Sequence, residues 1–278
     1  MGDPIRPKMK NKIQVGHKVL FIGDVHGNHE WEELTKEGLK SFYEIVFLGD
    51  YVDSFHISPV QQIHNLKNLV GSLRNHKKAG RKVTALLGNH DYSYIYNYPG
   101  ISGHNAIHAH EYRQLFTDNI DLFQIAWGYA SDNTGRYTMA SHAGLTQTFW
   151  NQFLLPEMMN PSSSVAQLIA AEERGNGSVD GDPFKPARKL AIHEKLNFFR
   201  DKGDILWKVG SDRGGWGTPG PLWGDFRELL EDPYEGIDQV VGHTPKISPS
   251  VVPNQNGCFY ACIDNWGNKK IASLIVSL

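Results

Sequence analysis

The sequence predicts an α/β sandwich with a mostly helical cap inserted late in the chain. In the first half, apolar runs of strand length alternate with helical patterns, which is typical of a largely parallel sheet. Five short segments each place Asp, Asn or His beside a glycine, and four of them directly follow an apolar run. These segments are residues 23–27, 49–53, 88–91, 141–144 and 242–244. The chain therefore delivers oxygen and imidazole ligands to the ends of strands, where such sheets bind their ligands.

Length and composition indicate a globular protein. The 278 residues are 40% hydrophobic and 21% charged, and a chain of this length can bury a substantial core. The formal net charge of -2 gives no electrostatic case for nucleic acid, and no apolar run approaches a membrane span. Cys258 and Cys262 fall on one face of a predicted strand about 13 Å apart, too far for a disulfide. We therefore expect free thiols and a cytoplasmic location.

The first half is expected to alternate strands with helices. The predicted strands are residues 18–22, 44–48 and 82–87, and the predicted helices are residues 28–41 and 59–78. An irregular stretch rich in Tyr and His is expected at 92–108. After it, residues 122–129 and 136–141 indicate two strands, joined by a turn-rich link at 131–135.

The later part of the chain predicts an insertion and a return to strands. A helix is expected to begin at 162–164, a loop to cover 175–186, a second helix 187–200, and tightly turned backbone 210–220. The final strands are predicted at 238–241, 258–263 and 271–276. The core is thus expected to comprise residues 1–146 and 223–278, with residues 147–222 as the helical and loop cap.

The five polar segments carry the ligands of a predicted dinuclear metal site. Asp24 and His26 alternate about one residue, so in extended backbone both can bind one cation. Asp50 ends the next strand and can bridge two cations. Asn89, His142 and His243 are the further predicted ligands of the second cation. This mixed ligand set favours Mn²⁺, with Fe or Zn²⁺ as alternatives, over Ca²⁺. Two such ions about 3.5–4 Å apart can bind phosphoryl oxygens and generate the attacking hydroxide.

Hydrolysis of a phosphoester also needs a proton donor and contacts to the phosphate. His90 directly follows Asn89 and is the predicted general acid. Asp53 is expected to hold its imidazole in the correct tautomer. Arg213, in a glycine-rich segment, is the predicted bidentate phosphate clamp, and Asn89 is expected to contact the phosphate as well.

The motifs resemble the signature blocks of the calcineurin-like metallophosphoesterases. The blocks are Asp-Val-His-Gly at 24–27, Gly-Asp-Tyr-Val-Asp at 49–53, Gly-Asn-His-Asp at 88–91, His-Ala-Gly-Leu at 142–145 and Gly-His-Thr at 242–244. The chain is most similar to the phosphoprotein phosphatase branch, which includes bacterial and phage serine/threonine phosphatases and symmetrical diadenosine tetraphosphate hydrolases. The resemblance spans residues 18–265 and implies a four-layer αββα sandwich.

The same resemblance implies roles for individual residues. Asp24, His26 and Asp50 would hold metal 1, and His90 with Asp53 would transfer the proton. Metal 2 would be held by Asp50, Asn89, His142 and His243.

Two departures from the family pattern bear on activity. Residues 242–245 lack the second His of the Gly-His-x-His motif, which agrees with the phosphoprotein phosphatase branch and disfavours nucleases. Ser54 and Phe55 stand where that branch has Arg-Gly, so one phosphate-clamping Arg is missing unless Arg213 or another side chain replaces it.

We expect a dinuclear metal-dependent phosphatase that acts on a phosphoprotein or a small phosphoester, with no membrane partner. One alternative is a dinucleoside polyphosphate hydrolase. Its base could stack on tyrosines beside the third block, at positions 92, 94, 96 and 98, although packing is the more ordinary role of such residues. Another alternative is a non-catalytic binding protein with a retained metal site. Substrate identity and oligomeric state are left open.

Overall fold

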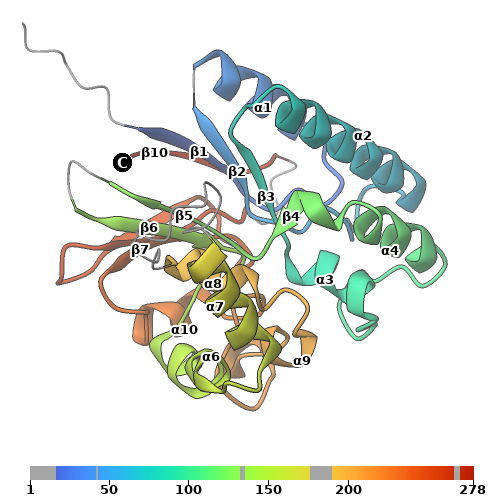
Figure 1. The fold of residues 1–278 in the computed structure, drawn as a ribbon. Helices are drawn as coiled ribbons and strands as arrows, with labels where there is room; N and C mark the ends of the chain where they lie inside the picture. The colour runs from blue at the N-terminus through green and yellow to red at the C-terminus, as the bar shows by residue number, and fades with distance from the viewer. Residues whose placement is uncertain (1–16, 42, 132–134, 176–189, 266–269) are drawn as a thin grey trace, which may run out of the picture.

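Two sheets lie face to face in the computed structural model, which describes residues 17–41, 43–131, 135–175, 190–265 and 270–278 (Figure 1). Sheet A has the strand order β10-β1-β2-β3-β4, and sheet B has the order β5-β6-β7-β9-β8. The strands of sheet A are β1 (Lys18–Ile22), β2 (Glu44–Phe47), β3 (Val83–Leu86), β4 (Phe123–Gln124) and β10 (Ser273–Ser277). The strands of sheet B are β5 (Ala126–Ala130), β6 (Tyr137–Ser141), β7 (Ile237–Val241), β8 (Ser250–Pro253) and β9 (Phe259–Cys262).

Sheet A is parallel from β1 to β4, and β10 pairs antiparallel with β1. Successive side chains of a strand point to opposite faces. Val19 and Phe21 therefore pack toward sheet B, whereas Leu20 and Ile22 pack toward the helices. Both faces are buried, which explains why these strands appear in the sequence as continuous apolar runs.

The helices over sheet A are α1 (Trp31–Lys40) and α2 (Pro59–Lys78). Helix α2 begins where predicted because Ser58 and Gln61 form a capping box and Pro59 occupies the first turn. Two further helices follow β3, namely α3 (Asn89–Tyr96) and α4 (Ala109–Thr117). The prediction of irregular structure from residue 92 is wrong for α3. The Asp91 carboxylate accepts a hydrogen bond from the Gly88 N–H at 2.9 Å and so stabilises the first turn.

A single strand predicted at 122–129 is in fact two strands in different sheets. Residues 120–122 form a 3-10 turn, then β4 pairs with β3 and β5 pairs with β6. The chain crosses between the sheets at Ile125. There the Asn197 Oδ1 accepts the N–H groups of Ile125 and Ala126 at 2.8 and 2.9 Å, which satisfies the backbone at the crossing.

Sheet B is covered on its outer face by helix α10 (Phe226–Glu231). Phe226 and Leu229 pack against Val241, Tyr260 and Cys262. The molecule therefore has the four layers expected, helix, sheet, sheet and helix. Helix α10 and the edge strand β8 were not predicted, since six residues and four residues are too short for a periodic signal.

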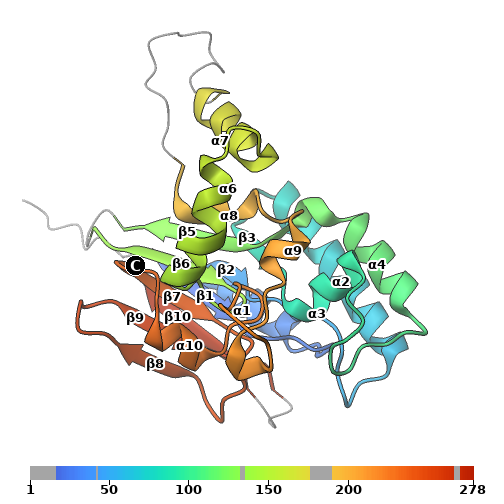
Figure 2. The same cartoon turned by 90° about the horizontal axis from the view of Figure 1, so that it is seen from below.

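The part of residues 147–222 that the structure describes is helical, and no strand occurs in it. Its elements are α5 (Gln147–Phe149), the π-helix η2 (Trp150–Leu154), α6 (Leu155–Met159), α7 (Ser164–Gly175), α8 (Ile192–Asn197), α9 (Gly203–Leu206) and the 3-10 helix η3 (Ser211–Arg213). Helices α6 and α7 stand away from the sheets (Figure 2). The limits of the core and cap stay a prediction.

Three smaller expectations can be compared with the structure. Apart from its first residue, the predicted loop at 175–186 lies outside the described residues. Residues 187–189 of the predicted second helix also lie outside them, and the described helix α8 is shorter than expected. Both cysteines are buried free thiols, as predicted. Among the described residues, no helix has the length and apolarity that crossing a membrane requires.

Candidate metal centre

The predicted ligands lie at the carboxyl ends of strands from both sheets. Sheet A contributes the residues that follow β1, β2 and β3, and sheet B contributes those that follow β6 and β7. In chain order these residues are Asp24, His26, Asp50, Asn89, His142 and His243. Because the two sheets are stacked, the ends of their central strands meet at one edge.

The side chains form two groups that share Asp50. Ligand atoms of Asp24, His26 and Asp50 lie within 4.8 Å of one another, and so do those of Asp50, His142 and His243. The sequence predicted the same two groups, with Asp50 common to both. Asn89 joins the second group, since its Oδ1 lies 2.9 Å from His142 Nε2 and 3.0 Å from His243 Nδ1.

The spacing of the second group fits a metal ion. His142 Nε2 lies 3.2 Å from His243 Nδ1 and 3.3 Å from Asp50 Oδ2. Ligands bound at about 2.0–2.2 Å to one cation stand about 3 Å apart in an octahedral shell. The four side chains therefore enclose a volume of the correct size for a first-row divalent ion.

Hydrogen bonds on the far side of two imidazoles set their tautomers. His26 Nδ1 donates to the Val52 carbonyl at 2.7 Å, and His142 Nδ1 donates to the Leu48 carbonyl at 2.8 Å. Each Nε2 is then left with a lone pair that points into the site. His142 Nε2 and Asp50 Oδ2 are both acceptors and would repel each other without a positive charge between them. This donor set therefore fits a bound cation.

Backbone strain is concentrated at this site. Among the described residues other than glycine, φ is positive at His26 (42°), Asp50 (51°), Asp53 (64°) and His243 (63°), and elsewhere only at Asn97. The left-handed region costs such residues of order 1–2 kcal/mol each. The surrounding packing must hold these residues in place, and four of the five carry groups of the predicted site.

Two of the motif glycines are needed because carboxylates rest against the backbone. A Cβ at Gly88 would lie 2.1 Å from Asp50 Oδ1, and a Cβ at Gly242 would lie 2.1 Å from Asp24 Oδ1. No side chain fits at either position. The pairing of glycine with a polar residue in the sequence motifs thus follows from steric requirements at the ends of the strands.

The predicted proton-transfer pair is in contact. His90 Nδ1 lies 2.9 Å from Asp53 Oδ2, and His90 Nε2 lies 4.0 Å from Oδ2 of the predicted ligand Asp50. Burial lowers the pKa of His90, but the carboxylates of Asp50 and Asp53 outweigh it and raise this pKa to about 9. His90 is thus favoured in its protonated form in the protein without metal.

Tyr94 is a residue of this site that the sequence analysis missed. Its hydroxyl donates to the second oxygen of Asp53, so the carboxylate is held by His90 on one side and Tyr94 on the other. On a helix, residues four apart lie on one face, as His90 and Tyr94 do on α3. A prediction of helix α3 from the sequence would therefore have placed Tyr94 beside His90.

Buried carboxyl groups and imidazoles lie close together in the site and shift one another's pKa values. Burial raises the pKa of Asp50, but His142 and His90 outweigh it and hold this pKa well below its ordinary value. The pKa of Asp24 is raised by its burial, by Asp264 and by Asp50. Asp264 was not predicted, although it follows the apolar end of β9 just as Asp24 follows that of β1.

Arg213 lies beside the second group but already has protein partners. Its Nη2 donates to the His243 carbonyl at 3.1 Å and to Thr244 Oγ1 at 3.0 Å, and its Nε lies 3.2 Å from Asp225 Oδ2. The side chain is 23% exposed. These contacts hold the guanidinium close to His243, and its phosphate-binding role stays a prediction.

A cavity of about 640 Å³ adjoins the first group. Asp24, His26 and Asp53 form one side, and Phe55 and Ile57 contribute an apolar wall. Phe55 is 75% exposed, and the loop that presents it is the segment where the phosphoprotein phosphatases have Arg-Gly.

The tyrosines beside the third block take the packing role. Tyr92 and Tyr94 are buried, at 0% and 2% exposure, and so offer no open face to a base. Tyr96 and Tyr98 are partly exposed, and Tyr98 stacks on Trp207 with its ring centre 4.4 Å away.

The solved structures that resemble this chain share little sequence with it. A hypothetical protein from Pyrococcus horikoshii is 12% identical, with a TM-score of 0.43 and coverage of 94% of this chain and 88% of its own. A serine/threonine phosphatase from Saccharomyces cerevisiae is 14% identical, with a TM-score of 0.38 and coverage of 96% and 82%. The phosphatase domain of the Legionella effector WipB is 13% identical, with a TM-score of 0.37 and coverage of 84% and 78%.

Likeness at this level carries no argument about activity, and no curated protein matches the chain in sequence. The family profile of the calcineurin-like phosphoesterases, however, matches residues 17–260. That range contains all five motifs and all six predicted ligands. The protein therefore belongs to the calcineurin-like phosphoesterase family.

Proposed function

We propose that this protein is a dinuclear metal-dependent phosphatase that hydrolyses phosphomonoesters. The observation that carries the proposal is the pair of ligand groups that meet at Asp50. In this proposal Asp24, His26 and Asp50 hold one ion. The second ion is held by Asp50, Asn89, His142 and His243. When bound, such ions bind the phosphoryl oxygens and lower the pKa of a coordinated water; Mn²⁺ is the expected metal.

The residues of the chain supply the remaining chemistry. His90 Nε2 faces the ligands and is positioned to protonate the leaving oxygen, while Asp53 orients the ring through Nδ1. The Asn89 side chain and the Arg213 guanidinium are expected to contact the phosphate. Two buried free thiols agree with a reducing compartment, and a cytoplasmic location is part of the proposal.

The first test is hydrolysis, with added Mn²⁺, of p-nitrophenyl phosphate, a phosphoserine peptide and diadenosine tetraphosphate. Turnover of the first two supports the proposal. Preference for the dinucleotide would favour a dinucleoside polyphosphate hydrolase, for which Phe55 and Ile57 in the adjoining cavity offer an apolar surface to a base. If two metals bind and none of the three substrates turns over, the proposed activity is wrong.

The ligand assignment is tested by metal content. His243→Ala should remove about one metal equivalent per chain, measured by elemental analysis after dialysis, because the second group loses one of its four ligands. His29→Ala is the matched control, since His29 is exposed and, in the described part of the chain, Glu32 is the one acid that its side chain pairs with. Retention of both metals by His243→Ala would show that the assignment is wrong.

The acid assignment is tested with two leaving groups. His90→Ala should lose most activity on an alkyl phosphate, whose leaving oxygen needs a proton, and keep far more on p-nitrophenyl phosphate. Full activity of this variant on the alkyl ester would contradict the assignment.

A further inference from the structure

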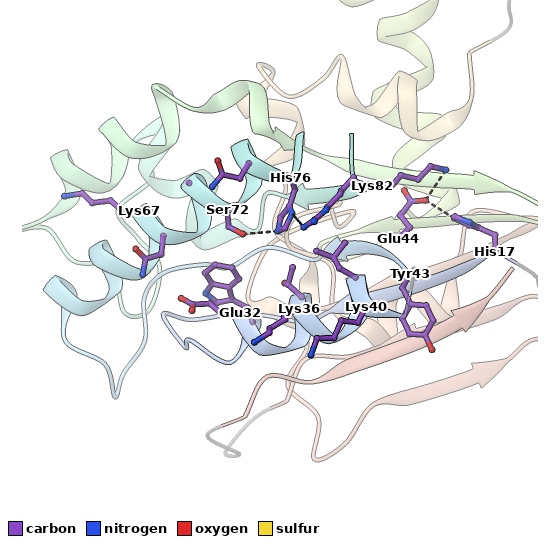
Figure 3. A pocket seen from close by; sticks show the side chains of 17 residues that line it. His17, Glu32, Lys36, Lys40, Tyr43, Glu44, Lys67, Ser72, His76 and Lys82 are labelled. Carbon is purple, nitrogen blue, oxygen red and sulfur yellow. Dashed lines mark hydrogen bonds and ion pairs between the residues drawn. The ribbon is translucent and has the colours of Figure 1, made fainter. Parts of the chain in front are cut away.

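A second large cavity lies between α1 and α2, on the outer side of sheet A (Figure 3). Its volume is about 1230 Å³. The side chains of His17, Glu44 and Lys82, which precede or begin strands β1, β2 and β3, close one end of it. The metal ligands follow the opposite ends of the same strands. Each strand is about 13–17 Å long, so this groove is separate from the metal centre.

Small and polar side chains line the groove on the α2 side. On α2 these are Asn68, Gly71, Ser72 and Asn75, which share one helix face. A Cβ added at Gly71 would meet nothing within 4 Å. On α1, Thr35 is 4% exposed, and its hydroxyl is buried without a hydrogen-bond partner in the described part of the chain. Among the described residues this lining hydroxyl is thus unpaired, although it is covered from solvent.

The charges on the groove are unbalanced. Lys36 and Lys40 of α1, Lys67 of α2 and Arg81 line it, and in the described ranges none of these four forms an ion pair with an acid. The two carboxylates that line it, Glu32 and Glu44, each lie near a histidine, and Glu44 also lies near a lysine. Glu32 lies 3.8 Å from His29, and Glu44 is paired with His17 and Lys82 at 2.8 and 3.9 Å. A locally positive surface thus occurs on a chain of net charge -2.

We propose that this groove binds an acidic peptide segment of a partner protein. Its volume exceeds the roughly 300–1,000 Å³ of sites for small molecules. Lysines on flexible stems suit separated carboxylates, whereas bidentate phosphate recognition favours arginine. Asn68 and Asn75 are exposed, line the groove and can pair with peptide main-chain groups. Peptide binding in this groove would depend neither on bound metal nor on the phosphatase activity.

Two variants test the proposal with a fluorescent peptide in which glutamate alternates with leucine, by anisotropy at low salt. Gly71→Leu places a bulky side chain in the groove from a position where a Cβ meets nothing within 4 Å, and it should also favour the helix, so we expect the fold to be kept. Lys36→Glu with Lys40→Glu reverses one rim. Each variant should weaken binding about tenfold or more, and added salt should weaken binding of the wild type.

The matched control is Lys78→Glu with Arg113→Glu, which reverses two exposed cations that do not line the groove and should leave affinity unchanged. Unaltered binding to Gly71→Leu and to the rim variant would overturn the proposal. So would binding of inorganic tripolyphosphate with no binding of the peptide. Hydrolysis of p-nitrophenyl phosphate should be equal in all variants, so the result is independent of the phosphatase proposal.

Discussion

The carboxylate of Asp53 is held on both oxygens, by His90 Nδ1 and by the Tyr94 hydroxyl. Asp53 itself is 2% exposed and has a left-handed backbone with φ of 64°. A buried carboxylate with two partners cannot rotate, so it fixes the plane of the His90 ring. At the scale of single residues, Tyr94 is therefore a positioning residue for the proposed acid.

Tyr94→Phe should keep the fold and reduce kcat on an alkyl phosphate several-fold. Without the Tyr94 hydroxyl, the Asp53 carboxylate interacts more strongly with the protonated His90 ring, so the pKa of His90 rises. The alkaline limb of the pH–rate profile should therefore move to higher pH. Tyr96→Phe is the control, because its hydroxyl bonds to Arg200 and Asp201 instead. Equal profiles for both variants would contradict this role.

His90 should also make the metal-free protein less stable as the pH rises. Its pKa is raised to about 9 in the folded chain, against about 6.5 when unfolded. The folded state therefore binds more protons in this window, and the free energy of unfolding should fall by about 1–3 kcal/mol between these values. Urea unfolding with a chelator measures it. His90→Asn should lack this slope, and the same slope in both proteins would contradict the argument.

At the scale of elements, the ends of β2 and β3 are locked to the start of α3. The Asp91 carboxylate accepts the N–H groups of Asp50 and Tyr51 at 2.8 Å each and that of Gly88 at 2.9 Å. The His90 N–H in turn donates to Asp50 Oδ1 at 2.9 Å. The Asp50 carboxylate is thus placed by the backbone of a neighbouring helix, and Gly88 allows this close contact.

Two glycine substitutions should have opposite effects on stability. Gly88→Ala pushes a methyl group against Asp50 and should lower the free energy of unfolding and abolish metal binding. Gly71→Ala, in open space on α2, should raise it by about 0.5–1 kcal/mol. Chemical denaturation measures both. If Gly88→Ala left the free energy of unfolding unchanged and still bound metal, the predicted steric conflict with Asp50 would be wrong.

At the scale of the whole molecule, the proposed ions connect the two sheets. Asp24, His26 and Asp50 lie at the end of sheet A, and His142 and His243 at the end of sheet B. Between the sheets the core is formed by side chains such as Phe21 and Trp127. Metal binding should therefore stabilise the packing of one sheet on the other.

Addition of Mn²⁺ to chelator-treated protein should raise Tm. A ligand at about 100 times its Kd stabilises the folded state by about 2.7 kcal/mol per site. His142→Ala, which removes a ligand of the second group, should show a smaller rise by scanning calorimetry. An unchanged Tm on metal addition would contradict the predicted ligand groups.

The sequence by itself determined most of the strands, the αβ order of the first half and the six polar residues that gather at the ends of strands. Apolar runs that end in Asp or His are local signals, and a polar residue beside glycine at a strand end marks a tight turn that exposes its side chain. Residues 18–22 and 59–78 were predicted to the residue for the same reason, since both elements carry strong local patterns.

Only the tertiary structure decided the contacts that act between segments. Tyr94 reaches Asp53 across 41 residues, and Asn197 satisfies the backbone where residues 122–129 divide between two sheets. The groove between α1 and α2 depends on how two helices cross a sheet, which no periodicity encodes. Such features arise from packing between distant parts of the chain, whereas the motifs arise from backbone geometry within a few residues.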